Sequence, residues 1–251
     1  MTRKPRSRIG AFAPWLDVGA IAAWGLLMVN YWLSGKLNLL IHPNYIALVV
    51  AGGLGLLAIA LFKGWILFTG KTPGNVQHFS IFPPGWSSLL LLVTALIGLQ
   101  FTPRAFASDI AVQRGVADVA GLTRIQPQAF RAAVRPEKRT LIEWIRMLAV
   151  YPEPDAYQGQ TVKVQGFVIH PQTLPPNYLM VARFIITCCA ADVYPVGLPV
   201  KLLKNRSTYP PDTWIEIEGE MLTEKIEGKR QLTIQEKKIT RIEQPANPYD
   251  Y

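Results

Sequence analysis

Three long apolar runs in the N-terminal part of the sequence place the strongest constraint on what this chain can fold into. They cover residues 16–33, 45–62 and 86–101, and Asp17 is the one charged residue within them. Each run is close to the roughly 17–25 residues that a helix needs to cross a bilayer. Aromatic side chains lie near the run ends, as is common at the headgroup level of a membrane. The runs predict a membrane protein with about three N-terminal transmembrane helices; the alternative is a helical bundle buried in protein.

The charge distribution predicts the orientation of these helices. The net charge is +9, and residues 1–103 carry seven basic residues but a single acidic one. Four basic residues precede the first run, Lys63 and Lys71 follow the second, and only Lys36 lies between the two. Since cytoplasmic loops are enriched in Lys and Arg, we expect a multi-pass protein of the plasma (inner) membrane with a cytoplasmic N-terminus. Everything after the third run is then extracytoplasmic. No small-residue cleavage site follows the first run, so we interpret it as an anchor and not as a signal peptide.

The short loop between the first two runs contains His42 and Pro43. Pro43 is suited to the first turn of the second helix, where a missing amide hydrogen costs little. His42 in the same place can serve as a metal or proton ligand at the membrane surface. The sequence is compatible with both interpretations.

The remainder of the chain divides into a connector, residues 104–137, and an extracytoplasmic domain, residues 138–251. The connector shows little periodicity and predicts one short helix at most. A helix then begins at Thr140, because Thr140 and Glu143 have the spacing of a capping box and apolar residues follow at helical spacing. Pro152 ends this helix.

After this helix the hydrophobic pattern changes to the two-residue period of β-strands. Five strands are expected, near residues 161–168, 179–187, 197–203, 214–220 and 231–242. Gly166 is expected to form a bulge or bend in the first of them. This order predicts a small α+β or all-β domain, best matched by an OB-like five-stranded barrel. A fold does not carry function with it, and this part of the chain is only mildly basic. We therefore expect no nucleic-acid partner.

The two cysteines of the chain, Cys188 and Cys189, are adjacent, and Asp192 follows them closely. They can be small buried hydrophobic residues, a vicinal disulfide or a soft-metal site. In the third case Asp192 is a ligand or an orienting group, and His170 or His42 joins from elsewhere in the chain. The cofactor is then a soft metal ion such as zinc, although zinc sites usually use spaced cysteine pairs.

The sequence contains no catalytic triad, phosphate loop or dinucleotide motif, so we expect no enzymatic activity.

Several segments in this order carry a resemblance to a known family. They are Gly35 to Tyr45, Phe167-Val168, the string from Arg183 to Asp192, and Trp214 to Gly219. The chain resembles, over nearly its whole length, the YcgQ-like family of bacterial membrane proteins, which are regarded as subunits of a two-component permease. The resemblance implies an accessory, membrane-anchored subunit beside a polytopic permease. It favours functional roles for His42, Cys188, Cys189 and Asp192. Three further residues are candidates for supporting roles, namely Arg183, Pro43 and His170.

Three classes of function follow from these features. The leading hypothesis is a transport accessory protein whose helices contact the lipid bilayer and a permease, and whose outer domain binds a metal or metalloid ion through the cysteine pair. The second is a thiol-redox or envelope-assembly protein in which the pair cycles between dithiol and disulfide. The third is a structural anchor with the cysteines in its core.

Overall fold

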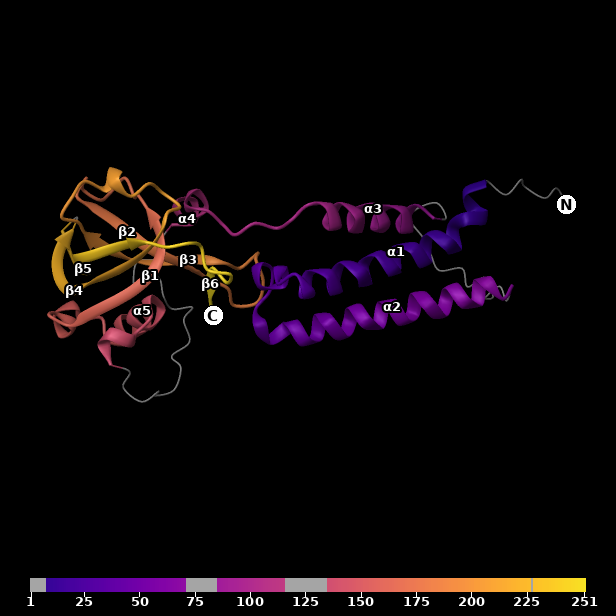
Figure 1. Cartoon of the computed structure of the whole chain (residues 1–251), viewed down its shortest axis with the longest axis horizontal. Coiled ribbons are helices and arrows are strands. Elements are labelled where there is room, and N and C mark those ends of the chain that lie inside the picture. The colour runs from indigo at the N-terminus through magenta and orange to yellow at the C-terminus, as the bar shows by residue number, and fades with distance from the viewer. Residues whose placement is uncertain (1–7, 71–84, 116–134, 227) are drawn as a thin grey trace. The chain divides into compact units, whose positions relative to one another are not determined.

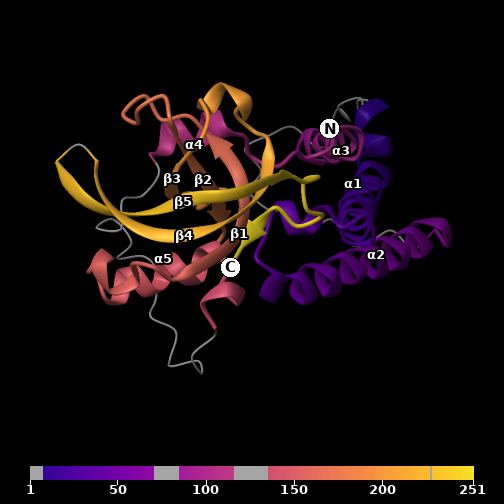
Figure 2. The same cartoon turned by 60° about the vertical axis from the view of Figure 1, so that its left-hand side comes forward.

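The chain divides into two compact units, Met1–Arg104 and Ala105–Tyr251 (Figures 1 and 2). The computed structural model describes residues 8–70, 85–115, 135–226 and 228–251. The predicted N-terminal tail, most of the second loop and the middle of the connector lie outside these residues. The first unit consists of apolar helices, and the second contains a β-sheet with short helices.

Each of the three apolar runs forms a helix of the first unit (Figure 1): α1 Arg8–Leu33, α2 Ile46–Phe68 and α3 Trp86–Gln100. Two short 3-10 helices, Lys36–Leu39 and Pro43–Tyr45, lie between α1 and α2. Among the described residues, two helical segments are long and apolar enough to cross a membrane, Phe12–Leu33 and Pro43–Phe68. Helix α3 has 15 residues. Its length of about 22 Å falls short of a hydrocarbon core of about 30 Å. The sequence predicted about three transmembrane helices. The structure has two helices of spanning length and one shorter apolar helix at these positions.

Glycines let α1 and α2 approach each other closely. A Cβ at Gly25 would lie 2.9 Å from the carbonyl oxygen of Gly53, so a larger residue at this crossing would push the helices apart. Gly52 and Gly55 have no atom within 4 Å of the place where a Cβ would lie, and they take no part in this packing. The close approach of small residues is a common way to pack helices in lipid.

Polar contacts also join the three helices. Trp24 Nε1 on α1 donates to the main-chain oxygen of Leu91 on α3 at 2.9 Å. The carboxylate of Asp17 on α1 accepts a hydrogen bond from the Ser88 hydroxyl on α3, and it lies 3.8 Å from Lys63 Nζ on α2. Because an isolated charge is costly among apolar helices, these two partners accommodate Asp17 there.

In the part of the second unit that the structure describes, residues 105–115, 135–226 and 228–251, there are two α-helices and six strands: α4 Ser108–Arg114, α5 Leu141–Val150, β1 Thr161–Ile169, β2 Tyr178–Ile185, β3 Tyr194–Lys201, β4 Trp214–Ile226, β5 Lys229–Arg241 and β6 Tyr249–Asp250. The same residues include the 3-10 helices Pro136–Lys138, Pro154–Tyr157 and Arg206–Thr208. Figure 2 shows β4 and β5 as long, curved strands with α5 beside the sheet.

Five of the strands pair in a closed circuit. β1 pairs with β4, β4 with β5, β5 with β3, β3 with β2, and β2 again with β1. Strand β1 reaches both neighbours because residues 161–167 pair with β4 and residues 167–169 pair with β2. The β3–β5 pair is parallel and the other four pairs are antiparallel. The sixth strand, β6, runs parallel to β2, which completes a mixed sheet of six strands.

The core of this unit lies between α5 and the strands. The predicted capping box is confirmed, since Thr140 Oγ1 accepts from the Glu143 amide at 3.3 Å and Glu143 Oε2 accepts from the Thr140 amide at 2.8 Å. Apolar side chains of α5, including the fully buried Trp144, pack against Val, Ile and Leu side chains of β1 to β5. Valines that alternate with polar residues at the start of β1 form part of this core, as their two-residue period predicts.

The strands differ from their prediction at two places around the cysteines. The second predicted strand was expected to reach Thr187 but ends at Ile185, and the third begins at Tyr194, earlier than the expected Gly197. The short strand β6 was not predicted at all.

Gly166 forms no bulge, because the register of β1 with β4 continues through it. A Cβ at Gly166 would lie 2.5 Å from the carbonyl oxygen of Ala182 on β2, so glycine is needed there for the close approach of two strands. The register shift of the sheet lies elsewhere, between Glu218 and Gly219 on β4.

Candidate functional site

Both cysteines lie in the connection between β2 and β3, which we call the cysteine turn (residues 186–193). Because β2 ends at Ile185, the rule that neighbouring strand residues face opposite sides of a sheet does not apply to them. Cys188 is exposed, Cys189 is half-buried, and both thiols are free. Neither cysteine is a core residue of the domain.

Asp192 holds the cysteine turn in shape. Its Oδ2 accepts hydrogen bonds from the Cys188 amide at 2.8 Å and from the Thr187 hydroxyl, and its Oδ1 accepts from the Cys189 amide at 3.2 Å. The two sulfur atoms and a carboxylate oxygen of Asp192 all lie within 4.8 Å of one another. The turn therefore gathers three potential ligand atoms from five consecutive residues.

The electrostatics of the turn favour a carboxylate at Asp192 beside a protonated Cys188 thiol. Burial opposes the ionisation of Asp192, but hydrogen bonds from Thr187 and from the amides of Cys188 and Cys189 lower the pKa of its carboxyl below the ordinary value. Hydrogen bonds with Cys189 and then with Asp192 raise the pKa of the Cys188 thiol to about 11. Cys188 is therefore a neutral thiol near pH 7, and it becomes a thiolate when a metal ion displaces the proton.

This donor set suits a soft metal ion. Thiolate sulfur is the ligand type that selects zinc and other thiophilic ions. The Asp192 carboxylate has about four lone-pair sites and accepts hydrogen bonds from the Thr187 hydroxyl, from the amides of both cysteines and from the Cys188 thiol. Loss of the thiol proton would free one of these sites for coordination. Zinc in structural sites takes about four protein ligands. Since the turn offers three donors, it would leave a bound zinc ion with an open position.

Comparison with known proteins identifies the domain that carries this turn. Residues 137–251 match the family model described as the DUF1980 C-terminal domain. The chain is also 31% identical over 108 residues to the UPF0703 protein YcgQ of Bacillus subtilis (strain 168). The C-terminal domain is YcgQ-like. This confirms the predicted family resemblance for the C-terminal domain, and the cysteine turn lies within the matched range. The match covers 42% of this chain and 37% of the length of YcgQ.

Within the YcgQ-like domain, Arg183 lies at the end of β2, shortly before the cysteine turn. Its guanidinium group contacts the carboxylate of Asp250 on β6, with Nε to Oδ2 at 3.1 Å, and lies 5.2 Å from the ring centroid of Trp214. Arg183 thus contacts β6 and Trp214 of β4, and its supporting role stays a prediction.

The two predicted histidines are placed elsewhere. Among the described residues, the cluster of potential metal ligands contains neither His170 nor His42. His170 Nε2 donates to the carbonyl oxygen of Tyr209 at 2.9 Å, and burial lowers the pKa of its imidazole. His42 caps the 3-10 helix that begins at Pro43, with its Nδ1 accepting from the Asn44 amide at 3.2 Å. Pro43 therefore begins a helical segment, as the first of the two interpretations of this loop predicted.

Sequence reasoning missed two residues that shape this region. Thr187 hydrogen-bonds the ligand-forming carboxylate of Asp192, and its position directly before the cysteines was the available signal, because Thr and Asp side chains commonly bond in turns. Asp250 pairs with Arg183 across a long stretch of sequence. Periodicity carries no signal for such a pair.

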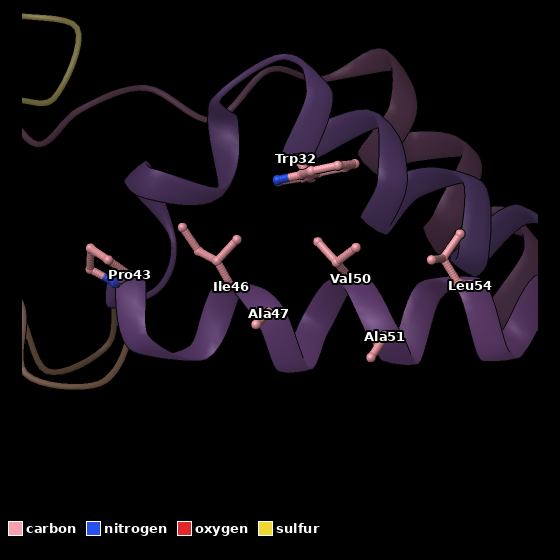
Figure 3. Close-up of a pocket in the computed structure, with 7 residues that line it drawn as sticks. All are labelled: Trp32, Pro43, Ile46, Ala47, Val50, Ala51 and Leu54. Carbon is pink, nitrogen blue, oxygen red and sulfur yellow. The ribbon is translucent and has the colours of Figure 1, made fainter.

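The helical unit has an apolar groove with a volume of about 600 Å³. Figure 3 shows Trp32 of α1 above Ile46, Val50 and Leu54 of α2, with Pro43 at one end. The side chains that line the groove are apolar and offer no ligand or nucleophile. The cysteine turn is therefore the candidate functional site.

Proposed function

We propose that this chain is a membrane-anchored accessory subunit of a permease, and that its C-terminal domain binds a soft metal or metalloid ion at the cysteine turn. The observation that carries the proposal is the cluster of two free thiols and one carboxylate within 4.8 Å. The ion is held by Cys188 and Cys189, and Asp192 acts as a third ligand or as the group that orients the thiols.

The fold supports a binding role for this domain. The closed circuit of five strands, with α5 against its core, is the arrangement expected of an OB-like barrel, and we infer that the domain is one. In such a barrel the connection between two strands is a usual place for ligand contacts. The proposed role involves binding and transfer, and we expect no enzymatic activity.

The helical unit supports membrane anchoring. Two helices are long and apolar enough to span a bilayer, and large apolar side chains are exposed along all three helices, among them Leu48, Leu61 and Leu96. Exposed apolar surface of this extent is typical of contact with lipid or with other membrane helices. We propose that lipid and a polytopic permease share this surface, in the inner membrane.

Metal analysis of the purified full-length chain tests the proposal. The protein in detergent, kept reduced, is titrated with Zn²⁺ and separately with Cd²⁺ in the presence of a chromogenic chelator. We expect about one ion per chain for the wild type and none for the Cys188→Ser/Cys189→Ser variant. The exposed ion pair between Glu153 and Arg230 offers a control, Glu153→Gln, which should bind as the wild type does. Equal, near-zero binding by the wild type and the double variant would rule out a metal site at the turn.

A thiol-redox protein is the alternative function, because two free adjacent thiols lie at an exposed turn. The raised pKa of Cys188 argues against it, since a neutral thiol is a weak nucleophile in disulfide exchange. Thiol trapping in cells distinguishes the two. A pair that cycles appears in two interconverting forms, whereas a metal-binding pair stays reduced and is protected by Zn²⁺.

The permease partner is tested by affinity purification of the full chain from membranes, followed by mass spectrometry. A polytopic transporter at near-equal abundance supports the accessory role. Its absence from the purified sample, with other membrane complexes intact, argues that the chain acts alone.

A further inference from the structure

The strand that leads into the cysteine turn would have an open edge without β6. β1 pairs with β2 only as far as Ala182, opposite Phe167, so the last residues of β2 have no β1 partner. β6 fills this place, with Tyr249 paired to Phe184 and Asp250 to Ile185. The final part of β2 is therefore held between β3 on one side and β6 on the other.

Within β6, Asp250 makes the contact that lies closest to the cysteines. Its main-chain oxygen accepts a hydrogen bond from the Ile186 amide at 3.1 Å, two residues before Cys188. Its side chain receives two hydrogen bonds from Arg183, from Nε at 3.1 Å and from Nη2 at 3.3 Å. The exposed fractions of the two side chains are 12% for Arg183 and 25% for Asp250, so this two-pronged ion pair is mostly shielded from water.

The neighbours of Asp250 fix β6 to the rest of the domain. Tyr249 is buried, and its hydroxyl oxygen accepts a hydrogen bond from the Phe106 amide at 3.1 Å. Arg146 of α5 donates to the main-chain oxygen of Tyr251 at 2.5 Å. Residues 249–251 thus tie together the segment before α4, helix α5 and the end of β2.

We propose that residues 249–251 act as a latch that positions the cysteine turn, with Arg183 and Asp250 as positioning residues for the thiols. This proposal rests on the proposed metal site and extends it. The latch fixes the backbone up to Ile186 on one side of the turn, and Asp192 fixes the amides of Cys188 and Cys189 within it. The two thiols are then held ready for an ion before it binds. Groups that orient metal ligands in this way typically affect affinity by about 10–100-fold.

The test uses the full-length chain with Asp250→Asn, which keeps the shape of the side chain and removes its charge. We expect the dissociation constant for Zn²⁺, measured by chelator competition, to rise about tenfold. Amide hydrogen exchange of residues 187–192 should accelerate, while that of β1 and β4 stays unchanged. Asp250→Glu retains the charge and should restore much of the affinity.

Glu224→Gln is the matched control, because Glu224 is as exposed as Asp250 and forms an ion pair with Lys201 at the opposite end of β3. Equal Zn²⁺ affinity in Asp250→Asn and Glu224→Gln would overturn the latch, and so would a loss of exchange protection spread over all strands.

If the wild type binds neither Zn²⁺ nor Cd²⁺, the proposed metal site fails. The latch is then judged on exchange at residues 187–192 and on the rate at which an aromatic disulfide reagent reacts with the thiols.

Discussion

At the scale of single residues, Asp192 determines the chemistry of the cysteine turn. One carboxylate binds the amides of both cysteines and the hydroxyl of Thr187. Hydrogen bonds to a charged acceptor are stronger than neutral ones, so the turn is held by a group that is itself a potential metal ligand. After the hydrogen bond with Cys189, the hydrogen bond with Asp192 is the next largest cause that raises the pKa of the Cys188 thiol.

The variant Asp192→Asn should therefore make Cys188 more acidic. Hydrogen bonds with Cys189 and Asp192 raise the Cys188 pKa to about 11, and the substitution removes the charge of the second partner. The midpoint of the pH–rate profile for thiol alkylation by iodoacetamide should move toward the ordinary value, with faster reaction at pH 8. Asp155→Asn, at an exposed ion pair with Arg230, is the control. An unchanged midpoint would show that Asp192 does not govern the thiol.

His170 should give the fold a dependence on pH. Burial lowers the pKa of its imidazole in the folded domain, while in the unfolded chain it titrates near 6.5. Protons therefore bind more readily to the unfolded chain, so this contribution to stability is complete above that value. It decreases as the pH falls through 6.5 toward the lower pKa of the folded state.

The measurement for His170 is chemical denaturation of the full chain between about pH 7 and pH 5. His170→Gln retains a donor for the Tyr209 carbonyl oxygen and removes the titrating group, so it should lose less stability over this range than the wild type. Parallel curves for the two proteins would contradict the assignment. His42→Gln, in the other unit, is the matched control.

At the scale of structural elements, the closure of the strand circuit depends on the crossing of β1 with β2. Gly166 lies directly before the residues of β1 that pair with β2, and the carbonyl oxygen of Ala182 occupies the space of its missing side chain. A methyl group at this point must displace the backbone of one of the two strands.

The variant Gly166→Ala should consequently destabilise the domain by about 1–3 kcal/mol. A Cβ there would lie 2.5 Å from Ala182 O and 2.8 Å from Val181 Cγ2. The free energy of unfolding, measured by urea denaturation, checks the prediction. The neighbouring Gln165→Ala removes one exposed hydrogen bond to Glu216 and should change stability by about 0.5 kcal/mol at most. If Gly166→Ala lowers the free energy of unfolding no more than Gln165→Ala does, the two strands can move apart at this point without cost.

How much of this architecture could be predicted varies with the element. The capping box before α5 and the alternation in β1 are local patterns, and both led to the observed elements. The end of β2 at Ile185 was not predicted, because apolar residues continue up to Ile186. The amides of Cys188 and Cys189 hydrogen-bond to the Asp192 side chain. β6 consists of two residues and is too short to show any period. Its pairing depends on Arg183, far away in the sequence.

At the scale of the whole molecule, the proposed membrane anchoring makes the side on which the cysteine turn lies depend on the number of crossings. Three crossings from a cytoplasmic N-terminus place the C-terminal domain outside, whereas two return it to the cytoplasm. By length, α1 and α2 qualify as spans and α3 is short. A short apolar helix can still cross where the bilayer thins or flanking residues extend to the interface. The compartment also matters for the thiols, since an oxidising one favours disulfides.

The two native cysteines, together with two introduced ones, allow this topology to be measured. The chain contains no others, and Cys188 is exposed. With the N-terminus inside and three crossings, a membrane-impermeant maleimide should label the wild type in spheroplasts without lysis. In the Cys188→Ser/Cys189→Ser background, Ser34→Cys at the end of α1 should be labelled, and Thr69→Cys at the end of α2 should react only after lysis. Labelling of Ser34→Cys without labelling of the native pair would instead establish two crossings. The cysteine turn would then face the reducing cytoplasm, which keeps its two thiols reduced.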